Sequence, residues 1–190
     1  MAKPDYLFDI GNVILFFDFE KFAKAIEADC EVPVPRLLEM IADPKSEMEA
    51  STMETEDFLK LAFETIGYRG TREAFIKAWQ HIFTLNEPVA KMIERLKSEG
   101  HRMLLLSNTN QLHVDHFMND YPVFRCFDDW VFSHEAGSAK PDPAIYEHTI
   151  TKFGIDPGNT IYIDDLEPNI RAGEKFGFRA IHYVGQDLEA

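Results

Sequence analysis

The feature that most constrains the fold of this chain is the alternation of short apolar runs with helical patterns in its second half. The apolar runs lie at residues 103–106, 130–132, 160–163 and 180–184, with helical patterns between them at 111–118, 142–153 and 167–176. Short apolar strands that alternate with helices predict a parallel sheet covered by helices on both faces. We therefore expect an α/β fold with a Rossmann-like parallel sheet.

Another apolar run near the N-terminus ends in an acidic residue. The stretch Tyr6–Leu15 passes from an apolar run into Asp9, turns through Gly11 and Asn12, and becomes apolar again. A short apolar run bounded by glycine is typical of a buried strand, and an acid at its end lies at the mouth of the sheet. The same letters also fit a strand closed by an ordinary Gly-Asn turn, with Asp9 as a turn residue.

The stretch from Phe16 to about Asn86 contains helical patterns and no strand signal. Helices are expected at residues 20–29, 36–42, 55–66 and 71–83, the last with Trp79, Ile82 and Phe83 on its apolar face. A block of about 70 residues that is all helix predicts a compact helical insertion after the first strand. The expected domains are a core of residues 1–17 and 87–190 and an insertion of residues 18–86.

Composition and charge exclude several classes of protein. The chain has 190 residues, of which 45% are hydrophobic, so it is long enough to bury a core as one domain with an insertion or as two small domains. A formal charge of −14 argues against partners such as nucleic acid or an anionic membrane surface. Cys30 and Cys126 are too few for a disulfide framework, which fits a reducing cytosol. Neither a membrane span nor a signal peptide is indicated. We expect a cytoplasmic monomer or homodimer.

Polar side chains gather where the expected strands end. In open α/β sheets, ligands bind beyond the carboxyl ends of the strands. Crowded carboxylates repel one another unless a cation lies among them, and hard oxygen ligands suit Mg²⁺, which often takes substrate phosphate as a further ligand. A carboxylate can also be a nucleophile that accepts a phosphoryl group. The residues expected at this edge are Asp9, Ser107, Asn108, Lys140, Asp164 and Asp165.

These residues carry a resemblance to a known family. Asp9 after an apolar strand, Ser107 after a second, Lys140 followed by Pro-Asp, and Asp164-Asp165 after a later strand resemble the four motifs of the haloacid dehalogenase-like hydrolase superfamily, in the family's order. The resemblance covers nearly the whole chain, and it implies that the helical insertion is the family's cap domain. The stretches 8–13 and 106–110 are similar to a subgroup with a bacterial α-D-glucose-1-phosphate phosphatase and the phosphatase domain of soluble epoxide hydrolases.

The resemblance implies roles for the matching residues at the metal. Asp9 would be the nucleophile and a Mg²⁺ ligand, and the carbonyl group of Gly11 would be a second ligand. Asp165 would be the main second carboxylate on the metal. Asp164 would bind beside it, directly or through water.

The resemblance also implies how phosphate is bound. Ser107 and Asn108 would bind the transferring phosphate, and Lys140 would hold both that phosphate and Asp9. One position departs from the family pattern, because family phosphatases usually carry a general acid and base where this chain has Gly11. General acid–base catalysis contributes about 10²–10⁴-fold, so we expect a preference for good leaving groups such as an anomeric phosphate.

Five residues outside these motifs could have a functional role, and each also has a simpler structural explanation. Glu47 or Glu49 could replace the missing acid, although solvated surface acids are the more common case. His113 and His116 share a helical face, but a transition-metal site needs more converging ligands, so a packing role is expected. Asn169 fits either a support for the Asp164-Asp165 loop or a helix surface residue.

Three functions fit these residues. The first is a Mg²⁺-dependent phosphatase acting on a small phosphorylated metabolite, with a sugar phosphate as the class that the resemblance suggests. The second is a 2-haloacid dehalogenase with Asp9 as nucleophile and no metal, against which the added negative charge of Asp164-Asp165 argues. The third is a non-catalytic protein that binds a phosphorylated ligand, suggested by Gly11.

Overall fold

The central element of the fold is a parallel sheet. The computed structural model of the chain describes residues 3–49, 52–186 and 188. Within these residues, five parallel strands form one sheet in the order β5-β4-β1-β6-β7. They are β1 (Asp5–Phe8), β4 (Met103–Ser107), β5 (Asp129–Phe132), β6 (Thr160–Asp164) and β7 (Arg179–His182). The predicted α/β fold is confirmed, and the first strand lies at the centre of the sheet between β4 and β6.

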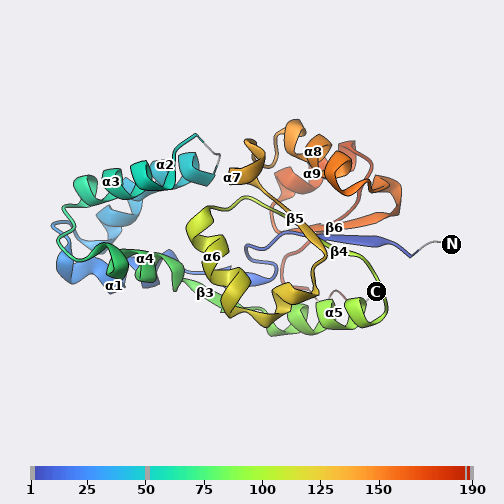
Figure 1. Cartoon of the computed structure of the whole chain (residues 1–190), viewed down its shortest axis with the longest axis horizontal. Helices are drawn as coiled ribbons and strands as arrows, with labels where there is room; N and C mark the ends of the chain where they lie inside the picture. The colour runs from blue at the N-terminus through green and yellow to red at the C-terminus, as the bar shows by residue number, and fades with distance from the viewer. Residues whose placement is uncertain (1–2, 50–51, 187, 189–190) are drawn as a thin grey trace.

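Helices cover both faces of the sheet (Figure 1). Along β1, Tyr6 and Phe8 pack on the face of α5 and α6, whereas Leu7 packs on the face of α8 and α9. This alternation follows from the two-residue period of a strand. The covering elements are α5 (Glu87–Ser98), α6 (Gln111–Asp120), η2 (Pro122–Cys126), α7 (Ser133–Ala136), α8 (Pro143–Phe153), η3 (Pro157–Asn159) and α9 (Glu167–Lys175).

Local signals account for several of the helix ends. The Asp142 side chain accepts a hydrogen bond from the Ala144 N–H at the start of α8, and Gly154 ends that helix with a φ of 60°. Asn86 occupies the predicted cap position of α5 but makes no capping bond. Its side chain instead donates to the Val13 carbonyl and to the Tyr183 hydroxyl, so it ties α5 to two other segments.

Among the described residues of the insertion, four α-helices and one short 3-10 helix pack around an aromatic core of their own and form the helical lobe at one end of the molecule (Figure 1). Trp79 is fully buried there, against the rings of Phe22 and Phe58, as predicted for a core residue. The lobe consists of α1 (Phe19–Ile26), η1 (Glu27–Asp29), α2 (Val34–Glu49), α3 (Thr55–Ile66) and α4 (Arg72–Gln80).

A short ribbon joins the lobe to the sheet. β2 (Leu15–Phe17) and β3 (Phe83–Leu85) pair antiparallel, with Leu15 opposite Leu85 and Phe17 opposite Phe83. The predicted helix over residues 71–83 is therefore wrong at its end, and the prediction of no strand in this stretch is wrong too. Each strand finds its hydrogen-bonding partner almost 70 residues away, which local periodicity does not reveal. The predicted domain boundaries fall at this ribbon, and the division stays a prediction.

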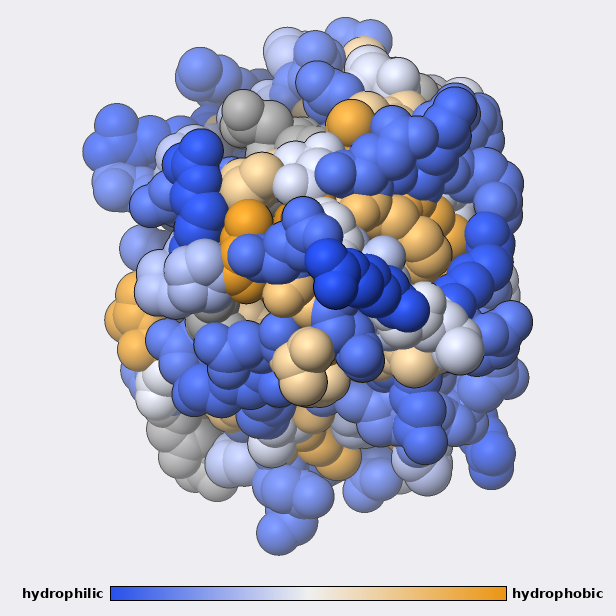
Figure 2. Space-filling view, turned by 90° about the vertical axis from the view of Figure 1, so that its left-hand side faces the viewer, coloured by the Kyte–Doolittle hydropathy of each residue, from blue (hydrophilic) through white to orange (hydrophobic). Residues whose placement is uncertain are grey.

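The surface at the end of the helical lobe is predominantly hydrophilic and is interrupted by small apolar patches (Figure 2). This agrees with the acidic composition of the chain. Among the described residues, no helix has both the length and the apolar character needed to cross a membrane.

Candidate functional site

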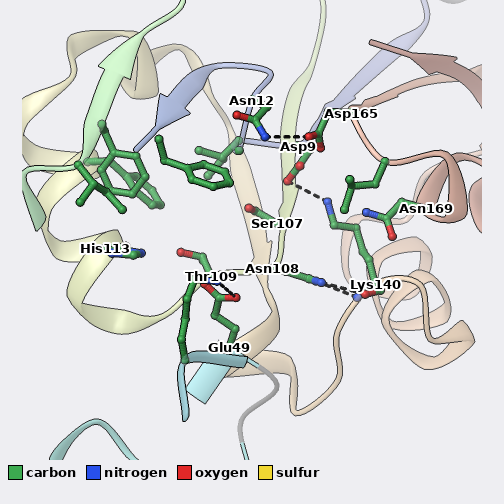
Figure 3. Close-up of a pocket in the computed structure, with 18 of the residues that line it drawn as sticks. Asp9, Asn12, Glu49, Ser107, Asn108, Thr109, His113, Lys140, Asp165 and Asn169 are labelled. Atoms are coloured by element: carbon green, nitrogen blue, oxygen red, sulfur yellow. Dashed lines mark hydrogen bonds and ion pairs between the residues drawn. The ribbon is translucent and has the colours of Figure 1, made fainter. Parts of the chain in front are cut away.

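The ends of the three central strands open into one cavity. Asp9 follows β1, Ser107 is the last residue of β4, and Asp165 follows β6. All three line a cavity of about 250 Å³, together with Lys140 (Figure 3). The carboxyl ends of adjacent parallel strands meet at one edge, which explains why residues far apart in the sequence lie together here.

Lys140 is the buried cation at the centre of the site. Its ammonium lies 2.8 Å from Asp9 Oδ1 and 2.6 Å from Asp164 Oδ2, and it donates to the Leu106 carbonyl at 2.9 Å. Burial lowers the pKa of Lys140, but the two carboxylates outweigh burial and raise it, so the ammonium stays charged. Lys140 therefore holds Asp9 in place and provides positive charge beside it.

Asp164 is fully buried and its carboxylate is saturated by protein donors. In addition to Lys140, it accepts hydrogen bonds from the Tyr162 hydroxyl at 2.6 Å, the Leu166 N–H at 2.9 Å and Asn169 Nδ2 at 3.0 Å. Burial raises the pKa of Asp164, but Lys140 and the other donors outweigh it and lower the pKa. Asn169 thus supports the strand-end loop and is not a helix surface residue, which decides between the two alternatives left by the sequence.

Asp165 differs from its neighbour because it faces the cavity. It is half-buried, and its side chain accepts a hydrogen bond from Asn12 Nδ2 at 3.0 Å (Figure 3). Asn12 has a φ of 52°, in the left-handed region that asparagine tolerates better than most residues. Asn12 was not singled out as a site residue from the sequence, although the Gly-Asn pair marked the turn that positions it.

The carboxylates of the site fit a divalent cation. Asp9, Asp164 and Asp165 each offer an oxygen, and these oxygens lie within 4.8 Å of one another, the one such group among the described residues. Three carboxylates face a single ammonium, and burial, opposed by Lys140, raises the pKa of Asp9 to about 7. A cation would relieve this excess of negative charge, and the all-oxygen donor set suits Mg²⁺. Gly11 also lines the cavity, where its carbonyl group can contribute.

The phosphate-binding residues expected from the sequence lie at the site in two different ways. Ser107 lines the cavity near Asp9, with its side chain directed into it (Figure 3). Asn108 also lines the cavity, and its side chain is held by the Lys140 backbone: Oδ1 accepts from the Lys140 N–H and Nδ2 donates to the Lys140 carbonyl, both at 2.8 Å. Its amide thus anchors the Lys140 loop.

The glycine that departs from the family pattern lies beneath an aromatic ring. A Cβ atom on Gly11 would lie 3.1 Å from Cε1 of Phe17, closer than ordinary van der Waals contact. Phe17, on β2, thus occupies the space that a larger side chain at residue 11 would need. The packing of this ring therefore favours glycine at residue 11.

The two candidate replacement acids lie in different surroundings. Glu47 is exposed, as expected for a surface acid. Glu49 is not a solvated surface acid, since its side chain lines the cavity and pairs with Lys45 at 2.7 Å. Burial, opposed by Lys45, raises the pKa of Glu49. The sequence carries no signal for Lys45, because its place in the cavity depends on how α2 packs against α1, α3 and α7.

His113 has the packing role that was expected. It is buried against the Trp79 ring, with Nε2 at 3.1 Å from the Trp79 carbonyl and Nδ1 at 3.0 Å from the Asn110 amide. Burial lowers the pKa of His113 to about 3, so the ring is neutral at physiological pH. His116 pairs instead with Asp120. The two histidines thus share no ligand, and His113 joins α6 of the sheet region to α4 of the lobe.

The site combines an aspartate, a serine and an aspartate pair at the strand ends with a lysine from the loop between α7 and α8, and this combination defines a hydrolase of one family. The chain belongs to the haloacid dehalogenase-like hydrolases, because the model of this family matches residues 6–177. The resemblance found in the sequence is confirmed at the level of the family.

Individual relatives include phosphatases and dehalogenases. The chain is 26% identical to a D-ribitol-5-phosphate phosphatase from Bacteroides thetaiotaomicron, over 90% of this chain and 87% of that protein. It is 23% identical to (S)-2-haloacid dehalogenase 4A from Burkholderia cepacia, over 67% of this chain and 56% of that protein.

Solved structures show the same fold. A crystal structure of a haloacid dehalogenase family enzyme from Bacteroides thetaiotaomicron matches with a TM-score of 0.86 at 23% identity, covering 99% of this chain and 97% of that chain. The same enzyme has been solved in complex with magnesium and inorganic phosphate, with a TM-score of 0.81, 23% identity and 98% of each chain covered.

Proposed function

We propose that this protein is a Mg²⁺-dependent phosphatase that hydrolyses a small phosphorylated metabolite, such as a sugar phosphate, through an aspartyl-phosphate on Asp9. The observation that carries the proposal is the pairing of Asp9 with the buried Lys140 at a cavity that Asp165 also faces. The names of the relatives support it, since one is a sugar-alcohol phosphate phosphatase and a related enzyme binds magnesium with phosphate.

The roles of the site residues follow from their surroundings. Asp9, Asp165 and the carbonyl group of Gly11 would hold Mg²⁺, which when bound neutralises phosphate charge. The Asp164 carboxylate is occupied by protein donors, so it orients Lys140 and reaches the metal at most through water. Ser107, at the end of the neighbouring strand β4, would bind the phosphate oxygens.

The reaction has two steps. A carboxylate oxygen of Asp9 attacks phosphorus, and the bond from phosphorus to the leaving oxygen breaks while Lys140 stabilises the negative charge. The leaving oxygen takes its proton from solvent, because residue 11 offers none. Water then attacks the aspartyl-phosphate, which releases inorganic phosphate and restores Asp9. This lack of a dedicated acid is why we expect good leaving groups to be preferred.

The division into a core of residues 1–17 and 87–190 and a cap of residues 18–86 belongs to the same proposal. The helical lobe has its own aromatic core and is joined to the sheet by the ribbon of β2 and β3. A cap attached in this way can close over the cavity while the phosphoryl group is transferred to Asp9 and open again to admit the water of the second step.

The dehalogenase alternative has a relative and a shared nucleophile in its favour. A metal-free displacement at carbon, however, gains nothing from a second cavity-facing carboxylate that repels Asp9. Asp165 lies in that position and is oriented by Asn12. The site therefore supports a phosphatase better than a dehalogenase.

The proposal is tested by measuring p-nitrophenyl phosphate hydrolysis with Mg²⁺, with EDTA, and in Asp9→Asn. We expect turnover that needs both the metal and Asp9, with rates that fall as the leaving-group pKa rises across a series of monoesters. Halide release from 2-chloropropionate without metal would instead establish the dehalogenase. Mg²⁺ binding with no turnover on any ester would establish a non-catalytic binding protein.

A further inference from the structure

An ion pair on the helical lobe faces the same cavity as the nucleophile. Lys45 and Glu49 lie one turn apart near the end of α2, with Nζ and Oε2 separated by 2.7 Å. Their side chains are only 24% and 19% exposed, and both line the cavity that contains Asp9. The family motifs include neither residue.

Protein groups use only part of the pair's hydrogen-bonding capacity. A carboxylate accepts about four hydrogen bonds and an ammonium donates three. Across the described chain, the pair's one recorded side-chain hydrogen bond is the bond that joins Lys45 to Glu49. Lys45 Nζ also lies 5.2 Å from the centre of the Phe19 ring. This cation–π contact is electrostatic and leaves the other N–H groups of Lys45 able to donate hydrogen bonds. Partly buried charges with spare capacity bind ligand groups that both donate and accept.

The position of the pair is fixed relative to the expected phosphate site. The backbone carbonyl of Glu49 accepts a hydrogen bond from the Ser133 hydroxyl. The same hydroxyl accepts from the Thr109 N–H at 3.0 Å, and Thr109 follows the strand end that carries Ser107. Figure 3 shows Glu49 beside Thr109, across the cavity from Asp9. A ligand with its phosphate at Asp9 can therefore reach Glu49 across the same cavity.

The cavity has room for more than a phosphate group. Its volume of about 250 Å³ also accommodates a short carbon skeleton attached to the phosphate. A hydroxyl group both donates and accepts, so two neighbouring hydroxyls on such a skeleton can donate to Glu49 and accept from Lys45.

We propose that Lys45 and Glu49 form a binding site for the hydroxyl groups of the substrate, which selects short polyol or sugar phosphates over phosphate esters with apolar skeletons. This inference rests on the proposed phosphatase function. Glu49 acts in it as a hydrogen-bond acceptor, with the Lys45 ammonium beside it at 2.7 Å as the donor.

The test compares kcat/KM for ribitol 5-phosphate and n-pentyl phosphate, which share a primary leaving oxygen but differ in their other hydroxyls. In the wild-type protein we expect the polyol ester to be preferred. Glu49→Gln and Lys45→Met should each reduce that preference by about 10- to 100-fold, the usual range for a lost hydrogen bond to a charged group. The control Glu47→Gln changes an exposed acid on the same helix and should keep the preference.

Two results would overturn the inference. If kcat/KM in Glu49→Gln falls equally on both esters, Glu49 acts in proton transfer or in folding. If the preference for the polyol ester is unaltered, the pair has a structural role alone. The p-nitrophenyl phosphate assay separates this from the phosphatase proposal itself. If the wild-type protein hydrolyses no ester, calorimetric binding of the same two esters to Asp9→Asn with Mg²⁺ still measures the preference, and equal affinities would refute it.

Discussion

The sheet edge and the helical lobe face one cavity, but they hold their charged groups in opposite ways. At the sheet edge, Lys140 is satisfied by Asp9, by Asp164 and by a backbone carbonyl. On the lobe, Lys45 and Glu49 bond only to each other through their side chains in the described structure. The sheet edge is therefore preorganised, whereas the lobe leaves capacity for a ligand to fill.

This difference suits the two regions to different tasks, transition-state stabilisation at the sheet edge and ligand recognition on the lobe. Groups that stabilise a transition state act best when the fold has already oriented them. Groups that recognise a ligand need unsatisfied donors and acceptors in the free protein. The lobe obtains its stability elsewhere, from a core in which the Trp79 ring contacts Phe22 and Phe58. The cavity-facing pair of Lys45 and Glu49 lies outside that core.

The largest expected effect comes from breaking the preorganised edge. In Lys140→Met, two buried carboxylates lose their cation, so we expect the free energy of unfolding to fall by about 3–5 kcal/mol and phosphatase activity to fall at least about 10³-fold. Urea denaturation and kcat/KM measure the two effects. The exposed Lys60→Met is the matched control. A stable and active Lys140→Met protein would show that the edge is not organised around this lysine.

A substitution at the cavity-facing carboxylate should separate activity from stability. Asp165 is only half-buried and has one side-chain donor, Asn12, so in Asp165→Asn we expect a stability change within about 1 kcal/mol. Activity should fall at least about 100-fold and need more Mg²⁺. Turnover measured against Mg²⁺ concentration checks this, with the exposed Glu174→Gln as control. Activity with unchanged Mg²⁺ dependence would count against Asp165 as a ligand.

The smallest expected effect concerns His113, which lies where α6 of the sheet region meets α4 of the helical lobe. The pKa of His113 is lowered to about 3, so only the unfolded chain gains its proton as the pH falls below about 6.5. Protonation of this residue in the unfolded chain should therefore lower the free energy of unfolding by about 2 kcal/mol between pH 8 and pH 5.

Unfolding in urea at both pH values measures this loss. His113→Gln should show the smaller pH dependence, while the exposed His148→Gln should match the wild-type protein. Identical pH dependence in His113→Gln would mean that the buried ring carries no such linkage.

Much of this protein was determined by the sequence alone. Helix starts and stops such as Asp142 and Gly154 are local, and the period of apolar residues separates strand from helix without knowledge of the rest of the chain. The parallel sheet then follows, and with it the meeting of Asp9, Ser107 and Asp165 at one edge.

Only the tertiary structure decided which polar groups bond to one another. The pairing of β2 with β3, the use of the Asn108 amide to anchor Lys140, and the burial of Asn169 against Asp164 join residues distant in the sequence or brought together by a turn. Lys45 and Glu49 look like any i,i+4 surface pair until α2 is packed over the cavity. Burial and hydrogen-bond partners depend on what surrounds a side chain, and that is a property of the folded chain.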